Sequence, residues 1–468
     1  MMKCYAGIDI GSTNIKLVVI DEKGDLCHKA ISPTPYIQDS YRCFDVQAID
    51  KVVDGMIEHA KPFGRLISVS FSSVGESVVP VKDGRALGNA VFHGELTQPT
   101  KEEEKIISKF SQYEKTGVIS NGLLSLEKIL WHHRNNAEKP EQFLPFTSYQ
   151  VYRKTGCSTW CYSQASRSNA YMVAEKRWNY ELLEALGIDA PGELGPHGMY
   201  CGEKDGILYG LGGHDHISAL YGLFKITGTS EFFLDSMGTS NMIALLLNKP
   251  LAVQSTYNPL GGGIVNGFDE GQSVLFRGLP LYGGFLAHWM KRFGCTVTNE
   301  NIRAINRQIV ENKEKALAFT AIIGGNFYHN KQLKLRDIEY PRIENNCSID
   351  RYIESVYAYN TMKTVQLVTD LGSFSNNAAI PYYCAGAATS NEVLMGMKAT
   401  ALRRPIICPD VGEVSALGAV CAGVEAAGER EVFDYMKEKL ASGNTVIPSE
   451  RYAAFVNKAR DSYRSVSF

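Results

Sequence analysis

A short pattern of strand, turn and strand occurs twice in this chain, about half a chain apart, and it limits the possible folds more than any other feature. The first copy reads IDIGSTN from Ile8 and continues with IKLVV, and the second reads DSMGTSN from Asp235 and continues with MIALL. Each turn begins with a glycine, which tolerates sharp bends and lets a backbone approach a ligand closely. The repeat predicts two related halves, residues 1–228 and 229–468, that meet near Gly228.

Runs rich in β-branched residues alternate with helical runs in both halves, which predicts an α/β fold. A chain of 468 residues is also longer than one hydrophobic core usually supports, so more than one domain is expected. Strands are expected at residues 4–10, 15–21, 67–72 and 231–235. Helices are expected at residues 101–111, 124–135, 179–186, 349–370, 391–402 and 414–427.

The charges of the chain nearly cancel, with 48 basic and 50 acidic residues, which argues against nucleic acid or an anionic membrane as a partner. No apolar run reaches the ~18–20 residues that a membrane span needs. The apolar N-terminal stretch is interrupted by Asp9 and Lys16, which indicates a folded strand pair rather than a signal peptide. Eleven scattered cysteines without a C-x-x-C motif favour reduced thiols and a cytoplasmic location.

The two turns have the chemistry of a phosphate site. Backbone N–H groups and hydroxyls that point into one cavity bind anions, and two copies can clamp a polyphosphate from both sides. In the first copy Asp9 stands two residues before Gly11, where a carboxylate suits Mg²⁺, whereas Ser236 holds that place in the second copy. Lys16 adds a positive charge after the first turn. The alternative is an ordinary hairpin turn, which is the better interpretation of one copy alone but not of the matched pair.

A second motif, GGHDH from Gly212 to His216, precedes a helix with an apolar pattern. This arrangement places Asp215 at or near a helix start, where its carboxylate can accept a proton from a substrate hydroxyl. Two alternatives compete: Asp215 only caps the helix, or His214, Asp215 and His216 bind a metal. The metal alternative lacks a third ligand on a strand, where alternation sends both histidines to one side and Asp215 to the other.

Small residues are frequent near the end of the chain, in GAATSN from Gly386 and in EVSALGA from Glu413. Such residues allow either the approach of a flat ring or the close packing of helices. The residues alone favour close packing.

These features, in this order and spacing, resemble the FGGY family of carbohydrate kinases, which belongs to the superfamily of actin, sugar kinases and Hsp70. The resemblance extends over nearly the whole chain and includes KILW from Lys128 and YSQASR from Tyr162. It implies two ribonuclease-H-like (actin-like ATPase) domains with an interdomain cleft, in which residues 1–228 bind the sugar and residues 229–468 bind the nucleotide. It also implies the transfer of the γ-phosphoryl group of ATP to a hydroxyl of a small, ketose-like sugar or polyol, with Mg²⁺.

The resemblance further implies roles for single residues. Asp215 is the expected catalytic base, and Asp9 is expected near the metal. Sugar hydroxyls are expected to contact Glu76, Asp215 and His216, with Glu95 in place of the acidic residue of the family's Trp-x-Asp signature. The phosphates and adenosine of ATP are expected to contact Gly11, Ser12, Thr13, Lys16, Gly238, Thr239, Ser240, Gly386, Ala387 and Asn391.

The sugar-facing motifs depart from the family pattern, whereas the phosphate and base motifs match it. Val74-Gly75 replaces a pair of glycine and glutamine, Cys161 replaces an aspartate, and His216 follows the base where glutamine is common. The resemblance therefore supports kinase chemistry without selecting one sugar.

Three other functions fit parts of the sequence. A non-catalytic regulator that binds sugar and ATP is compatible with the changed sugar motifs, but it needs neither Asp9 nor Asp215. An ATPase that drives a partner protein fits the first turn, but it fits GGHDH less well. A purely structural protein gives no reason for the matched turns. The expected partners are a small carbohydrate and ATP, with a homodimer left open.

Overall fold

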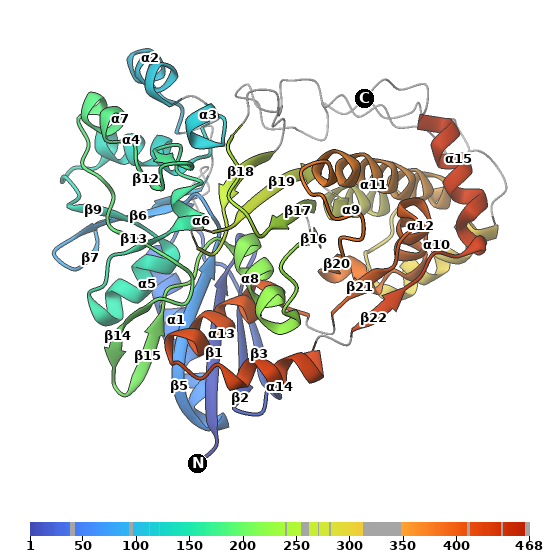
Figure 1. The fold of residues 1–468 in the computed structure, drawn as a ribbon, viewed down its shortest axis with the longest axis horizontal. Helices are drawn as coiled ribbons and strands as arrows, with labels where there is room; N and C mark the ends of the chain where they lie inside the picture. The colour runs from blue at the N-terminus through green and yellow to red at the C-terminus, as the bar shows by residue number, and fades with distance from the viewer. Residues whose placement is uncertain are drawn as a thin grey trace.

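The structure is a computed structural model that describes residues 1–37, 43–92, 97–111, 113–120, 122–238, 241–253, 262–269, 271–279, 282–311, 348–409, 412–440 and 443–463. Over these residues the fold is α/β with one large sheet in each half, as the sequence predicts (Figure 1). All the strands and helices expected above are present, with ends that differ by at most two residues.

The first sheet has the strand order β14 (Tyr200–Lys204), β15 (Ile207–Gly210), β5 (Arg65–Ser73), β1 (Lys3–Ile10), β2 (Asn14–Asp21) and β3 (Leu26–Pro33). β1 pairs antiparallel with β2 and parallel with β5, so Asp9 lies opposite both Lys16 and Ser72. From Cys4 to Ile10 the whole strand is buried, because helices cover both faces of the sheet. One face packs against α1 (Val46–Ala60) and α5 (Phe146–Thr155).

The second sheet repeats the strand-turn-strand core of the first. Its order is β18 (Gly262–Asn266), β19 (Ser273–Leu279), β17 (Asn241–Leu247), β16 (Phe232–Met237), β20 (Tyr382–Ala385), β21 (Ile406–Cys408) and β22 (Asn444–Val446). Here β16 pairs antiparallel with β17 and parallel with β20, as β1 does with β2 and β5. One face is covered by α9 (Tyr282–Arg292), α10 (Asn299–Glu311), α11 (Ile349–Gly372), α12 (Glu392–Leu402) and α15 (Ala453–Tyr463).

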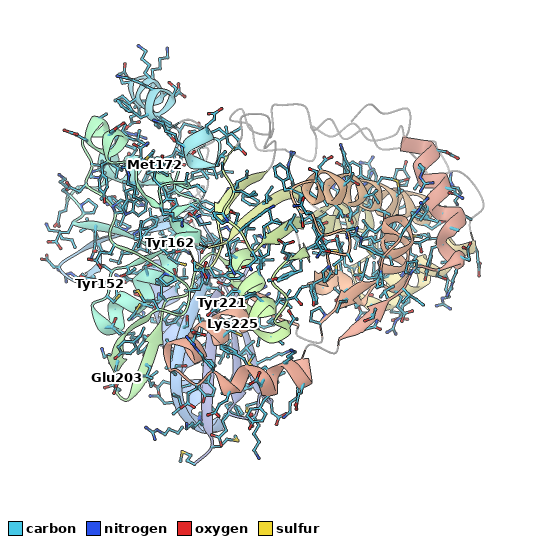
Figure 2. The ribbon with its side chains drawn as sticks, viewed as in Figure 1. Tyr152, Tyr162, Met172, Glu203, Tyr221 and Lys225 are labelled. Carbon is cyan, nitrogen blue, oxygen red and sulfur yellow. The ribbon has the colours of Figure 1, made fainter. Side chains whose placement is uncertain are left out.

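Two helices, α8 (Asp215–Thr227) and α13 (Val414–Ala426), lie between the sheets and share a hydrophobic core with both (Figure 1). They touch each other through glycine: a Cβ on Gly418 would lie 1.8 Å from the carbonyl oxygen of Ser218. Lys225 of α8, labelled in Figure 2, donates a hydrogen bond to Glu425 Oε2 of α13 at 2.7 Å. The small residues after Glu413 therefore serve close helix packing, as expected.

The chain passes between the halves at Gly228, which ends α8 in the left-handed conformation (φ 67°). By sequence α13 belongs to the second half, yet it packs against β1 and β5 of the first sheet. The division into residues 1–228 and 229–468 stays a prediction.

A lobe of short elements extends the first half (Figure 1). Its helices are α2 (Lys101–Phe110), α3 (Tyr113–Thr116), α4 (Ser125–Asn135), α6 (Tyr162–Ala165) and α7 (Tyr180–Leu186). Its short strands are β4 (Cys43–Phe44), β6 (Val78–Lys82), β7 (Arg85–Ala86), β8 (Ala90–Val91), β9 (Gln142–Pro145), β10 (Trp160–Cys161), β11 (Tyr171–Met172), β12 (Arg177–Trp178) and β13 (Leu194–Gly195). Near the C-terminus α14 (Glu431–Leu440) packs against α8. None of the helices in the described ranges is long and apolar enough to cross a bilayer.

Candidate active site

The first turn, between β1 and β2, is held by its backbone and presents its side chains to solvent. Thr34 donates through Oγ1 to the carbonyl oxygen of Gly11 at 2.7 Å and through its backbone N–H to that of Thr13 at 3.0 Å. The Tyr36 hydroxyl donates to the carbonyl oxygen of Ser12 at 2.5 Å. The side chains of Ser12 and Thr13 are exposed, so their hydroxyls are accessible to a ligand.

Asp9 lies buried at the end of β1. Its Oδ1 accepts a hydrogen bond from Ser72 Oγ at 2.7 Å. Burial and the negative charge of Asp215 raise the pKa of Asp9 to about 7. Among the described residues no cation lies within ion-pair distance of this carboxylate. A divalent cation would offset its charge, and Mg²⁺ commonly binds through one or two carboxylates together with waters and substrate phosphates. The site therefore fits Mg²⁺.

Lys16 forms a contact between the halves that the sequence did not indicate. Its Nζ lies 2.5 Å from Oε2 of Glu413, the N-cap residue of α13. The lysine side chain remains 31% exposed, so its ammonium group can also contact solvent or a ligand.

Asp215 is the first residue of α8, and His214 occupies the N-cap position. The interpretation of Asp215 as the N-cap is therefore wrong, whereas its expected place at the helix start is confirmed. Glycine is required just before it, because a Cβ on Gly212 would lie 1.7 Å from the carbonyl oxygen of Phe71. This close approach aligns the segment with the end of β5, where the N–H of Ser73 donates to the carbonyl oxygen of Gly213 at 3.1 Å.

Two histidines hold the Asp215 carboxylate in its ionised form. Oδ1 accepts from the backbone N–H of His216 at 2.7 Å and lies 2.8 Å from Nδ1 of His214. Nδ1 of His214 also accepts a hydrogen bond from the backbone N–H of His216 at 3.2 Å, which caps the helix. Burial alone would raise the pKa of Asp215, but its electrostatic interactions with His216 and His214 and these hydrogen bonds hold it below its ordinary value.

The metal alternative for His214, Asp215 and His216 is not supported. Within the described ranges, no three His, Cys, Asp or Glu side chains are placed to hold a metal ion.

Glu76, which is expected to contact the sugar, lies on the other side of His214 from Asp215. Its Oε1 accepts two hydrogen bonds from Arg167, from Nη2 at 2.6 Å and from Nε at 2.9 Å. The Nε2 atom of His214 is 4.0 Å from the same oxygen. Although burial opposes it, the charges of Arg167, His214 and Lys128 hold the pKa of Glu76 below its ordinary value. Glu95 lies outside the described residues.

Further polar groups surround this side of the site. Lys128 of α4 is buried, and its Nζ donates to Ser77 Oγ at 3.5 Å. Burial lowers the pKa of Lys128 to about 8. Cys161, which replaces the family's aspartate, lies 3.1 Å from Nδ1 of the buried His197.

The second turn and the Gly386 loop are the segments that are expected to contact the nucleotide. A Cβ on Gly386 (φ 106°) would lie 2.3 Å from the carbonyl oxygen of Met237, so the Gly386 loop contacts the strand that leads to Gly238. Ala387 begins the short 3₁₀ helix that follows. Thr239 and Ser240 lie outside the described residues.

Asn391 fixes the shape of that loop. Its Oδ1 caps α12 by accepting from the backbone N–H of Leu394 at 3.1 Å, and it also accepts from Asn306 Nδ2 at 3.0 Å. Its Nδ2 donates to the Tyr357 hydroxyl at 2.6 Å. With both ends of its amide bonded to protein, Asn391 positions the backbone of the loop.

The two turns differ in their carboxylates. Asp235 stands one residue before the place that corresponds to Asp9 and is fully buried. It forms an ion pair with Lys398 and accepts from Asn241 Nδ2 at 2.6 Å and from the Tyr382 hydroxyl at 2.7 Å. In the second half, the Asp235 carboxylate is therefore bonded to other buried side chains and is not open to a ligand.

The structure thus places Asp9 within electrostatic reach of Asp215 and Lys16, and Glu76 lies near His214, the neighbour of Asp215. Sequence analysis named the stretch that contains Arg167 and the one that contains Glu413, but not their partners. The roles of all these residues stay predictions.

Similar proteins define the class. Residues 4–196 match the model of the FGGY family of carbohydrate kinases, N-terminal domain. A xylulose kinase from Bacillus subtilis (strain 168) is 24% identical over 326 residues, which is 62% of either chain. A glycerol kinase from Thermococcus onnurineus (strain NA1) is 24% identical over 457 residues, 90% of this chain and 88% of that one. The crystal structure of Plasmodium falciparum glycerol kinase with ADP superposes with a TM-score of 0.78 at 16% identity, over 100% of this chain and 99% of that one.

The fold is that of a two-domain α/β protein of the actin-like ATPase type, which confirms the expected fold class. Residues 4–196 match the N-terminal domain of the FGGY family of carbohydrate kinases, and relatives similar to most of the chain are named kinases, which are phosphotransferases with an alcohol group as acceptor.

Proposed function

We propose that this protein transfers the γ-phosphoryl group of ATP to a hydroxyl of a small ketose or polyol, with Asp215 as general base. The observation that supports this most is the place of the Asp215 carboxylate. It is within electrostatic reach of Asp9 on the phosphate side and is joined through His214 to Glu76 on the sugar side.

In this mechanism Asp215 accepts a hydrogen bond from the acceptor hydroxyl and takes its proton as the oxygen attacks the γ-phosphorus. ADP leaves with the bridging oxygen. The neighbouring histidines keep the carboxylate ionised and oriented before the substrate binds. General-base assistance of this kind is worth ~10²–10⁴-fold in rate.

The phosphate side of the site supplies charge and alignment, which provide most of the catalysis in phosphoryl transfer. Ser12, Thr13 and the Lys16 ammonium group contact the terminal phosphates from the first half, and Gly238 and the Gly386 loop contact the nucleotide from the second. Asp9 would hold Mg²⁺, and the bound ion would supply positive charge to the transferred group.

The sugar side sets the choice of acceptor. Glu76 and His216 accept or donate hydrogen bonds to sugar hydroxyls, and a wrong acceptor leaves such buried groups unpaired. We propose cytoplasmic ketoses and polyols as the substrate class.

The test is ADP release by the purified protein with Mg-ATP, across xylulose, other ketopentoses, deoxyketoses, alditols, gluconate and glycerol. We expect one acceptor class to stimulate ADP release, and Asp215→Asn to reduce that rate by ~10²–10⁴-fold while ATP binding stays nearly unchanged. Asp189→Asn, at an exposed carboxylate, is the matched control and should keep full activity.

Near-normal turnover by Asp215→Asn would sink the assignment of the base. ADP release that ignores every acceptor would instead favour an ATPase that drives a partner protein.

A further inference from the structure

One side chain contacts both the proposed sugar site and the second sheet. Arg167, just after α6, donates its two hydrogen bonds to Glu76 with a side chain that is 16% exposed. Its guanidinium carbon also lies 4.9 Å from the ring centroid of Phe276, which is on β19 in the second half. Such a cation over an aromatic face is attracted to it, and more strongly where water is excluded.

The hydrogen-bond pattern leaves one oxygen of Glu76 open. Both nitrogens of Arg167 bond to Oε1, and in the described part of the chain no protein donor bonds to Oε2. Arg167 therefore fixes the orientation of the carboxylate and leaves Oε2 for a ligand hydroxyl. Because a guanidinium group is planar and rigid, a contact on one side of it also restricts how its nitrogens meet Glu76.

The edge of the second sheet is attached to the first half at this place. On β18, the N–H of Ile264 donates to the carbonyl oxygen of Gly117 at 3.0 Å. The N–H of Asn266 donates to Ser166 Oγ at 3.2 Å, next to Arg167. Nearby, the Tyr171 hydroxyl donates to Asn266 Oδ1 at 2.7 Å. Phe276 is therefore close to Arg167 only while this edge of the second sheet stays against the lobe.

We propose that Arg167 is a positioning residue that couples the two substrate sites: it orients Glu76 for the sugar, and its contact with Phe276 makes that orientation depend on the placement of the nucleotide-binding half. Such coupling is reciprocal, so the nucleotide strengthens binding of the sugar by the same factor as the sugar strengthens binding of the nucleotide. The proposal rests on the proposed kinase function, because it needs a sugar at Glu76.

Calorimetry tests the coupling through the dissociation constant of the acceptor with and without saturating Mg-ADP. The acceptor is xylulose, or glycerol if only glycerol supports ADP release. For the wild-type protein we expect Mg-ADP to tighten binding by ~5–150-fold. Phe276→Leu, which keeps an apolar side chain but loses the ring, and Arg167→Lys, which loses the planar fork, should bring this factor close to one.

Two variants serve as controls. Phe276→Tyr keeps an aromatic face and should keep the coupling, and it also reports on folding at this position. Arg451→Lys alters a similar contact, with Tyr452 at 5.8 Å, in a different part of the second half and should change nothing.

The proposal is overturned if Mg-ADP does not change acceptor binding by the wild-type protein, or if Phe276→Leu keeps the full factor. It is also overturned if Arg167→Lys weakens the acceptor equally with and without Mg-ADP, since that is the sign of a merely structural role. Failure of the kinase function has a different signature, the absence of acceptor-dependent ADP release by the wild-type protein.

Discussion

Among single residues, the buried His132 of α4 makes the stability of the fold depend on pH. Its side chain is 1% exposed, and Nδ1 lies 3.2 Å from Asn136 Oδ1. Burial lowers the pKa of His132 from its ordinary value near 6.5 to about 4. The folded protein therefore holds this ring neutral at a pH where the unfolded chain binds a proton.

We expect the free energy of unfolding to fall as the pH drops from about 6.5 towards 4. In this range His132 binds a proton in the unfolded state but stays neutral in the folded state. His132→Gln should remove about 2 kcal/mol of the stability that the wild-type protein loses between pH ~7.5 and pH ~5. Urea denaturation at both pH values measures this difference.

The exposed His59, changed to Gln, provides the control and should leave the pH dependence unchanged. If His132→Gln and the wild-type protein lose equal stability on acidification, the burial of a neutral ring is not the cause.

Local sequence determined the position of Asp215 at the helix start better than it determined the contacts between distant residues of the site. Two glycines before an apolar-patterned helix were sufficient to place Asp215 at a helix start. Arg167 and Glu413, in contrast, meet Glu76 and Lys16 across large sequence separations, and no local signal specifies such pairs. Asp235 begins the second copy of the repeat, but its buried ion pair with Lys398, far along the chain, has no local signal in the sequence.

At the level of elements, the contact between α8 and α13 joins the parts of the site. Asp215 begins the first helix, and Glu413 caps the second. The glycines at their crossing let the two helices approach closely, so both ends are held in register. The sequence indicated that the small residues of α13 serve close packing. It did not indicate that α13 packs against α8, because both helices are apolar on most sides and so many partners are possible.

We expect Gly418→Ala to destabilise the protein by ~1–3 kcal/mol, because the new methyl group would collide with the carbonyl oxygen of Ser218 and push the helices apart. Turnover should fall as well, since Asp215 and Glu413 move with their helices. Thermal unfolding and ADP release measure the two effects.

Gly55→Ala in α1 is a matched control, because a Cβ there meets no atom within 4 Å. Alanine in such a helix should stabilise by ~0.5–1 kcal/mol. If the two variants were equally stable, the contact would not be as tight as the structure indicates.

At the level of the whole molecule, the halves share one core. Tyr5 and Val18 of the first sheet, and Leu234 and Ala244 of the second, belong to the same buried cluster as α8 and α13. Sequence repetition predicted two related sheets, and this is confirmed. It did not predict that two helices would lie between them, because that arrangement depends on the return of the chain to the first half after β21.

We expect a single cooperative unfolding transition rather than one for each half, because neither sheet can lose these helices without exposing the shared core. Differential scanning calorimetry with matching calorimetric and van't Hoff enthalpies would support this. Two separate transitions would show that the halves unfold independently.

The two turns differ in their carboxylates, and this difference affects the orientation in which a polyphosphate can bind. In a molecule made of two identical halves, both turns would contact a polyphosphate in the same way. The polyphosphate could then bind in either orientation. Here the buried Asp9 at the first turn has no counterpart at Ser236, and the nearest carboxylate, Asp235, is bound to Lys398. We expect this loss of symmetry to fix the orientation of a bound polyphosphate, with its terminal phosphate towards Asp9 and the proposed base Asp215.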